Sequence, residues 1–195
     1  MDDPRLLELR RIFEQHSPRM AERYDGSREA AVAVLVRAHE ELEILLIKRA
    51  EHESDPWSGH VALPGGRRDA DDEDLMHTAL REAAEEVGIT IQRGAQLVGG
   101  LDEVSPRTPR LPPLIIAPFV FTVPRDTTPV IDPREVEAAI WVPLSALRDE
   151  SAASEILITL EGGSLAFPSL RFGDYVIWGL THRILVQFLE LTVAL

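Results

Sequence analysis

The chain has 195 residues, of which 45% are hydrophobic and 27% are charged, and its formal net charge is −13. This length suits one domain with a hydrophobic core of ordinary size. The acidic balance disfavours nonspecific binding to nucleic acid or to an anionic membrane surface. Because the chain has no cysteine, disulfides, thiolate metal sites and cysteine nucleophiles are excluded.

Neither an export signal nor a membrane span is predicted. The first residues lack the basic and apolar regions of a signal peptide. The longest uncharged run, 111–124, contains four prolines and is shorter than the roughly 20 apolar residues of a spanning helix. We therefore expect a cytoplasmic protein that works without a membrane and without nucleic acid.

The first half of the chain alternates between periodic segments and a long polar stretch. Residues 4–16 have apolar side chains at helical spacing behind Pro4 and predict a helix. The β-rich runs 30–36 and 42–48 are joined by a short polar connection and predict paired strands. Residues 49–74 are rich in Pro, Gly and Asp, which predicts a loop.

Beyond this loop the pattern predicts a helix, more strands and a closing helix. The first helix runs from about Leu75 to Val87, with Asp72 or Asp74 as its N-cap and Gly88 at its end. Three strands are predicted at 96–100, 114–123 and 136–142.

Pro118 places the middle one of these strands at an edge or at a bulge. The apolar spacing of residues 176–192 predicts the closing helix. No linker divides the chain, so we expect one mixed α/β domain over residues 1–195, with a helical lead at 1–28.

The predicted helix 75–87 carries a cluster of acidic residues. Glu82, Glu85 and Glu86 fall within one narrow sector, because separations of three and four return to the same helical face. Arg81 lies four residues before Glu85, at the right distance to pair with it. Three carboxylates on one face repel each other unless a cation lies among them, and hard oxygen ligands of this kind suit Mg²⁺ or Mn²⁺.

An acidic helical face is more often a solvated surface than a metal site. Here Gly65 and Gly66 precede the helix, and two glycines let the backbone approach a metal or a phosphate closely. The glycine pair, the carboxylate face and the flanking strands together favour a metal-bridged phosphate site.

The loop and helix at residues 65–89 resemble the signature of Nudix hydrolases, G-x5-E-x7-R-E-U-x-E-E-x-G-U, where U is aliphatic. Residues 81–89 fit its second half. The first half departs from the pattern, because the loop is one residue longer. Asp72 stands at the expected count from the glycine pair, whereas Glu73 has the expected spacing to Arg81. Which of the two acids replaces the first Glu stays open.

This resemblance implies an α/β/α sandwich with a mixed central sheet, and hydrolysis of a diphosphate linked to another moiety. Glu82, Glu85 and Glu86 are then the expected ligands of two or three Mg²⁺ or Mn²⁺ ions, which lower the pKa of the attacking water. The general base is Glu82 itself or Glu135, and Arg81 and Glu85 are also assigned to the catalytic group. Asp102 and Glu103 are weaker candidates for the base.

Arginines near this signature at residues 65–89 are the expected partners of the substrate phosphates, because a guanidinium binds phosphate oxygens in a bidentate manner. The candidate substrate-binding residues are Arg49, Arg67 and Arg68 with the backbone of Gly65 and Gly66, and further arginines at Arg107 and Arg110. Trp57 and Trp141 are candidates for stacking on a base, although Trp141 in an apolar strand favours a place in the core.

Residues 45–66 are similar to the segment that precedes the Nudix signature in coenzyme A pyrophosphatases, L-L-T-x-R-[SA]-x3-R-x3-G-x3-F-P-G-G. The matching residues are Leu45, Leu46, Arg49, Ala50, Gly59, Pro64, Gly65 and Gly66. The inner Arg is absent, with Ser54 or Asp55 in its place, and one residue is inserted. Residues 178–181 (WGLT) are also similar to that subgroup.

The leading substrate is therefore coenzyme A or a derivative, with ADP-ribose or a dinucleotide as the alternative. Two other classes compete with this hypothesis. A Nudix-fold ligand-binding protein without turnover usually carries a DNA-binding module or a signature that has lost its acidic residues, and neither is evident. An isoprenoid diphosphate isomerase of the same fold typically needs a Cys nucleophile. The oligomeric state is left open, with a homodimer as one option.

Overall fold

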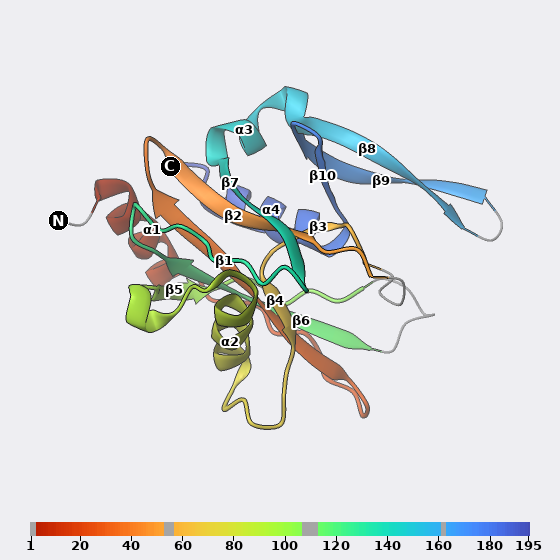
Figure 1. Ribbon diagram of the computed structural model, residues 1–195, viewed down its shortest axis with the longest axis horizontal. Helices are drawn as coiled ribbons and strands as arrows, with labels where there is room; N and C mark the ends of the chain where they lie inside the picture. The colour runs from red at the N-terminus through yellow and green to blue at the C-terminus, as the bar shows by residue number, and fades with distance from the viewer. Residues whose placement is uncertain (1–2, 53–56, 107–112, 161–162) are drawn as a thin grey trace.

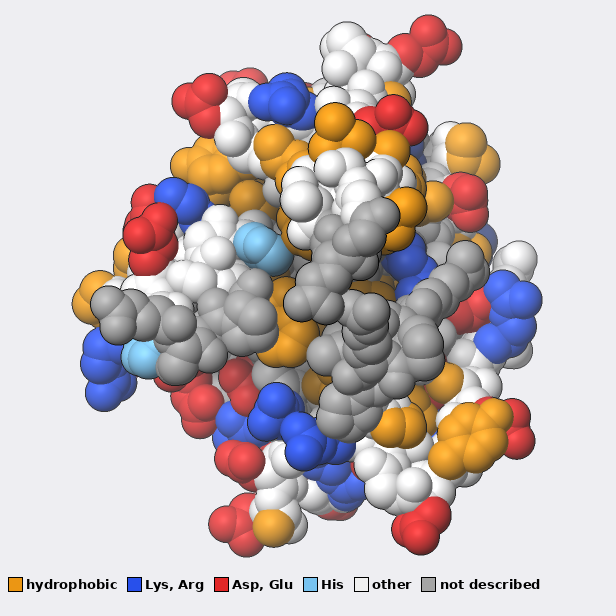
Figure 2. Space-filling view, turned by 90° about the vertical axis from the view of Figure 1, so that its right-hand side faces the viewer, with side chains coloured by type: hydrophobic (Ala, Val, Ile, Leu, Met, Phe, Trp, Pro, Cys, Tyr) orange, Lys and Arg blue, Asp and Glu red, His pale blue; other side chains and the backbone are white. Residues whose placement is uncertain are grey.

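The computed structural model of the chain describes residues 3–52, 57–106, 113–160 and 163–195. They form a seven-stranded mixed sheet, a three-stranded antiparallel sheet and helices on both faces of the larger sheet (Figure 1). This confirms the predicted α/β class with a mixed central sheet. Acidic side chains are spread around the rim of the face in Figure 2, in keeping with the net charge of −13.

The larger sheet follows the predicted strands closely. Its strands are β1 (Arg28–Ala38), β2 (Leu42–Arg49), β3 (Val61–Ala62), β4 (Gly65–Arg67), β5 (Gln96–Gly100), β6 (Leu114–Thr122) and β7 (Val136–Pro143). The order along the sheet is β3-β2-β1-β6-β5, and β4 pairs with β1 while β7 pairs with β2. Strands β1 and β2 pair, as predicted, and their pairing is antiparallel, whereas β1–β6 is parallel.

One face of this sheet is covered by helix α2 (Leu75–Val87). Asp74 is its N-cap, with a side-chain oxygen 2.9 Å from the backbone N–H of His77. Gly88 ends the helix in the left-handed conformation, at φ 66°, which glycine adopts without steric cost. The helix buries Ala79 and Ala83 against the sheet. The predicted helix is therefore confirmed, with Asp74 rather than Asp72 as its cap.

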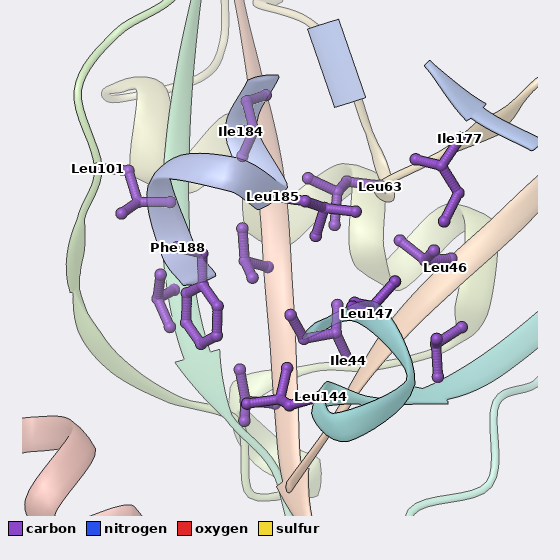
Figure 3. Packing of buried hydrophobic residues seen from close by; sticks show 14 of the residues in the cluster. Ile44, Leu46, Leu63, Leu101, Leu144, Leu147, Ile177, Ile184, Leu185 and Phe188 are labelled. Carbon is purple, nitrogen blue, oxygen red and sulfur yellow. The ribbon is translucent and has the colours of Figure 1, made fainter. Parts of the chain in front are cut away.

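The opposite face is covered by α1 (Pro4–Gln15), α3 (Leu144–Arg148) and α4 (Gly179–Leu191). Figure 3 shows how side chains of α3 and α4 meet those of β2 in one core. Leu144 and Leu147 come from α3, Ile184 and Phe188 come from α4, and all are buried. The predicted N-terminal helix is confirmed as α1.

Two predictions near the middle of the chain were wrong. The expected loop at 49–74 contains β3 and β4, which are too short to give a periodic signal. Strand β6 lies between β1 and β5, so Pro118 is not at an edge. Its carbonyl accepts the N–H of Leu101, at 3.0 Å, just beyond the end of β5. The irregular pairing lies on β5 instead.

The C-terminal region also differs from the prediction. The predicted closing helix starts too early, because residues 175–178 form β10 (Tyr175–Trp178) and α4 begins only at Gly179. These four residues are aromatic and β-branched, which favours a strand. The smaller sheet, with β8 (Ala153–Leu160) and β9 (Gly163–Phe172) beside β10, was not predicted. Its β8–β9 hairpin extends from the body of the molecule (Figure 1).

Candidate active site

A cleft of about 520 Å³ opens beside β4 and the middle of α2. Its charged end is lined by Arg49, Gly65, Gly66, Arg67, Glu82, Glu86 and Glu135. Its other wall is mainly apolar and aromatic and includes Val32, Trp57, Leu63, Leu114, Ile116, Trp178 and Leu180. The cleft therefore joins a group of carboxylates to a large apolar surface.

Glu86 is the most deeply buried carboxylate of the cleft, with only 1% of its surface exposed. Its Oε2 accepts the backbone N–H of Gly65 at 2.8 Å, and its Oε1 lies 3.8 Å from Nη1 of Arg49. Burial, assisted by the charges of Glu82 and Glu135, raises the pKa of Glu86 to about 8, although Gly65 and Arg49 act in the opposite direction. A buried carboxylate in this position is stabilised in its charged form by a cation.

Glu82 lies one turn before Glu86 and is also largely buried, with 13% of its side chain exposed. Burial raises its pKa despite the ion pair with Arg81, whose Nη1 is 2.9 Å from Oε1. A Cβ on Gly66 would lie only 2.4–2.7 Å from the carboxylate atoms of Glu82. Only glycine at position 66 therefore leaves room for this carboxylate.

Arg81 connects the loop before α2 to the helix through hydrogen bonds and ion pairs. It donates to both carboxylate oxygens of Asp72 at 3.0 Å, to Glu85 at 3.1 Å and to the carbonyl of Arg67 at 2.9 Å. The guanidinium holds the pKa of Asp72 well below its usual range. Glu73, by contrast, has 82% of its side chain exposed. Asp72, not Glu73, is therefore the acid that binds Arg81.

The structure brings together part of the predicted carboxylate cluster. Glu82, Glu86 and Glu135 line the cleft, whereas Glu85 is not among its lining residues. The Glu85 side chain is 53% exposed and pairs with Arg81, as predicted. In the part of the chain that is described, no three His, Asp or Glu side chains already form a metal-binding group.

The two buried carboxylates nevertheless fit a hard divalent cation, because both have raised pKa values and both line an open cleft. Mg²⁺ and Mn²⁺ are commonly held by one or two carboxylates, with water and substrate phosphates as the remaining ligands. The metal-ligand roles of Glu82, Glu85 and Glu86 stay predictions.

The arginine candidates separate into two groups. Arg49 and Arg67 line the cleft. Arg68 does not, because its guanidinium lies 3.0 Å from Glu29 and donates to the carbonyls of Asp72 and Glu73. The other candidates, Arg107 and Arg110, and the inner-Arg position at 54–55 lie outside the described residues.

The two weaker candidates for the base lie elsewhere. Asp102 pairs with Arg19 at 2.6 Å and Glu103 pairs with Arg23 at 2.7 Å. Both line a different cleft, beside α4. Their ion pairs connect the segment that follows α1 to the rest of the molecule, and the structure does not bring these two acids to the cleft of Glu82 and Glu86. Glu135 remains in the cleft.

The aromatic candidates are also separated by the structure. Trp57 lines the cleft, whereas Trp141 packs with the core under α2. The guanidinium of Arg37 lies over the Trp141 ring, 4.2 Å from its centroid, in a cation–π contact. The resembling string 178–181 lines the cleft as well. His60 was missed as a site residue: its ring centroid is 5.1 Å from that of Trp178. No spacing in the sequence links these two residues, because β3 and β10 meet only in the folded chain.

A mixed sheet between two layers of helices, with a carboxylate-bearing helix beside a glycine pair, is the arrangement expected of the Nudix class. The NUDIX domain family model matches residues 26–160, and the chain belongs to the Nudix family. A Nudix hydrolase of Yersinia pestis described as uncharacterized, NudL, is 33% identical, over 82% of this chain and 77% of its own. Nudix hydrolase 15, mitochondrial, of Arabidopsis thaliana is 34% identical, over 88% of this chain and 60% of its own.

An uncharacterized protein of Schizosaccharomyces pombe is 41% identical over 53% of this chain. The matches span only 32% of that yeast protein and 60% of the Arabidopsis protein. Among solved structures, a MutT/nudix family protein from Enterococcus faecalis has a TM-score of 0.60 at 19% identity, over 97% of this chain and 70% of its own. An Ap4A hydrolase of C. elegans has a TM-score of 0.51 at 21% identity, over 60% of this chain and 81% of its own. These two structures show the fold alone.

Proposed function

We propose that the protein is a divalent-metal-dependent pyrophosphohydrolase that cleaves the diphosphate of a nucleoside diphosphate linked to another moiety. The observation that carries this proposal is the pair of buried carboxylates, Glu82 and Glu86, which face an open cleft beside Gly65 and Gly66. Family membership is consistent with the reaction, since Nudix hydrolases act on phosphorus-containing anhydrides.

Mg²⁺ or Mn²⁺ held by Glu82 and Glu86 would lower the pKa of a water and neutralise charge on the diphosphate. The chain's own groups prepare the site for this chemistry. The N–H of Gly65 fixes Glu86, and Arg81 fixes Glu82. Glu135 is placed at the cleft to accept the proton of the attacking water, with Glu82 as the alternative base.

Arg49 and Arg67 are the groups proposed to bind phosphate groups of the substrate, because both line the charged end of the cleft. They also counter the repulsion between an anionic substrate and a chain of net charge −13. The apolar wall with Trp57 and Trp178 is suited to the part of the substrate that carries no charge.

Coenzyme A or a derivative is the leading substrate. Two separate segments that resemble the coenzyme A pyrophosphatases, 45–66 and 178–181, both contribute residues to the cleft. ADP-ribose or a dinucleotide is the alternative, because such a substrate has the same diphosphate without a further phosphate. A ligand-binding protein without turnover would occupy the same cleft and leave its ligand intact.

A substrate panel tests the proposal. Purified protein is incubated with coenzyme A, 3′-dephospho-coenzyme A, ADP-ribose and a dinucleotide, each with Mg²⁺ or Mn²⁺, and monophosphate products are separated by chromatography. We expect metal-dependent cleavage of coenzyme A to adenosine 3′,5′-bisphosphate and phosphopantetheine. Brisk hydrolysis of ADP-ribose alone would favour the alternative, and binding without any product would favour the ligand-binding class.

The cytoplasmic location and the homodimer stay predictions. In the part of the chain that is described, no helix is long and apolar enough to cross a membrane. Sedimentation analysis of the purified chain decides the oligomeric state.

A further inference from the structure

The pairing of β1 with β4 places two arginines on the face of the sheet that forms the cleft. Ala30 is paired with Arg67, and Val32 is paired with Gly65. Alternate residues of a strand point to the same face, and both Ala30 and Val32 line the cleft. Arg28 therefore lies on that face too, two residues further out along β1 and diagonal to Arg67.

A groove of about 460 Å³ lies at this outer position, next to the cleft. Arg28, Arg67 and Arg68 line it, together with Glu29 and Asp69. Arg67 also lines the cleft, so that it borders both hollows. The groove and the cleft thus lie on either side of the Arg67 side chain.

The charged side chains of the groove differ in whether they form ion pairs. Glu29 is held between Arg23 and Arg68, at 3.0 Å from each. In the described part of the chain, no ion pair within 4 Å involves Arg28 or Arg67. Figure 2 shows a group of Lys and Arg side chains among acidic ones in the lower half of the face it presents. The two arginines on the cleft face thus remain available to an anion.

We propose that Arg28 and Arg67 form an anion subsite that binds a phosphomonoester of the substrate, separate from the diphosphate that is cleaved. This inference rests on the proposed function and makes it more specific. At about 3.4 Å per residue along β1, Arg28 lies roughly 14 Å beyond Val32, which is paired with the glycine that binds Glu86. The subsite would therefore bind a phosphate that lies at a distance from the reacting bond, as the 3′-phosphate of coenzyme A does.

A comparison of two substrates tests this subsite in the intact enzyme. Coenzyme A carries the additional phosphate and 3′-dephospho-coenzyme A lacks it. We expect kcat/KM to favour coenzyme A by about tenfold, the low end for a charge-assisted contact because the site is exposed. Arg28→Gln should bring this ratio close to one and change kcat/KM for the dephospho form less than about twofold. Arg11→Gln, which removes an equal charge from the exposed face of α1, should leave the ratio unchanged.

A binding measurement separates failure of the subsite from failure of the proposed function. Adenosine 3′,5′-bisphosphate and adenosine 5′-monophosphate are titrated calorimetrically into the wild type and into Arg28→Gln, without turnover. Tighter binding of the bisphosphate by about tenfold in the wild type, lost in Arg28→Gln, supports the subsite even if coenzyme A is not cleaved. Equal binding of both by the wild type, or a preference that Arg28→Gln retains, overturns it.

Discussion

Gly65 and Gly66 are neighbours in the sequence, yet an added side chain would do different harm at each. At Gly65 a Cβ would lie 2.4 Å from the carbonyl oxygen of Ala31 and 2.6 Å from Cα of Val32, and both are backbone atoms that cannot move aside. At Gly66 it would meet only the carboxylate of Glu82, the mobile end of a side chain. Gly65 is therefore needed for the packing of β4 against β1, and Gly66 is needed for the position of the Glu82 carboxylate.

This difference predicts opposite outcomes for two alanine variants. Gly66→Ala should lower kcat at least about tenfold by displacing Glu82, with a Tm within a few degrees of the wild type. Gly65→Ala should lower Tm substantially, because β4 can no longer lie against β1. Thermal melts and steady-state kinetics on both variants check this. A Gly66→Ala enzyme with wild-type kcat would show that the position of Glu82 does not matter.

Glu86→Gln provides the sharpest test of the metal site. We expect kcat to fall by roughly 10²-fold or more at saturating Mg²⁺, since a lost ligand charge weakens stabilisation of the transition state. The Tm of the metal-free variant should hold or rise, because an amide can still accept the N–H of Gly65 while the repulsion from Glu82 is removed. Near-wild-type turnover would contradict the assignment of Glu86 as a ligand.

The carboxylate face of α2 was predictable from residue spacing. Separations of three and four place Glu82, Glu85 and Glu86 on one helical face, and Arg81 pairs with Glu85 as expected. Spacing could not reveal that the carboxylate of Glu85 stays outside the cleft, because this depends on the depth of α2 against the sheet. Arg28 gave no sequence signal, since only the folded pairing of β1 with β4 brings it into one groove with Arg67.

At the scale of elements, the contact between the loop and α2 depends on Asp72. Its side chain is 7% exposed, and it accepts bonds from Arg81, from the hydroxyl of Thr78 and from the N–H of Asp69. A hydrogen bond to a charged group contributes about 1.5–3 kcal/mol when buried. Among the described residues, the ion-pair partner of Glu73, the neighbouring acid, is His77, at the surface. The two acids therefore form a matched pair for mutation.

We expect Asp72→Asn to lower both Tm and kcat, because Arg81 then loses the partner that holds it against Glu82. Glu73→Gln should change either quantity little. The pKa of Asp72 is lowered from 3.8 in the fold, so its stabilisation is present above about pH 4 and is lost as the pH falls further. Denaturant melts should thus show the difference between wild type and Asp72→Asn shrinking below pH 4. A difference that stays constant from pH 7 to pH 3 would contradict this.

The elements that could be predicted share a strong local signal. Helix α2 has an acidic cap, an apolar stripe and a terminal glycine, and β1 and β2 are long apolar runs. The elements that were missed depend on partners distant in sequence. Strands β3 and β4 are two and three residues long, and β10 continues directly into α4, so its residues read as the first turn of that helix.

At the scale of the whole molecule, the C-terminal strands belong to the same core as the Nudix sheet. Ile177 of β10 is fully buried and lies beside Leu46 of β2 and Leu63 in Figure 3. The family model ends at residue 160, yet residues 178–181 complete a wall of the cleft. The part of the chain beyond the matched region therefore contributes residues to the cleft and to the same core.

This shared core predicts that the chain unfolds in one cooperative transition. Ile177→Ala should cost about 2–5 kcal/mol, because it leaves a cavity where the two sheets meet, and for a chain of this size each kcal/mol lowers Tm by roughly 2–4 °C. Leu157→Ala, on the extended hairpin where Leu157 is 71% exposed, should change stability by less than about 0.5 kcal/mol. Calorimetry of both variants, with tryptophan fluorescence as a second probe, measures this. Two separate transitions, with Ile177→Ala shifting only one of them, would instead mean that the smaller sheet unfolds independently of the site it borders.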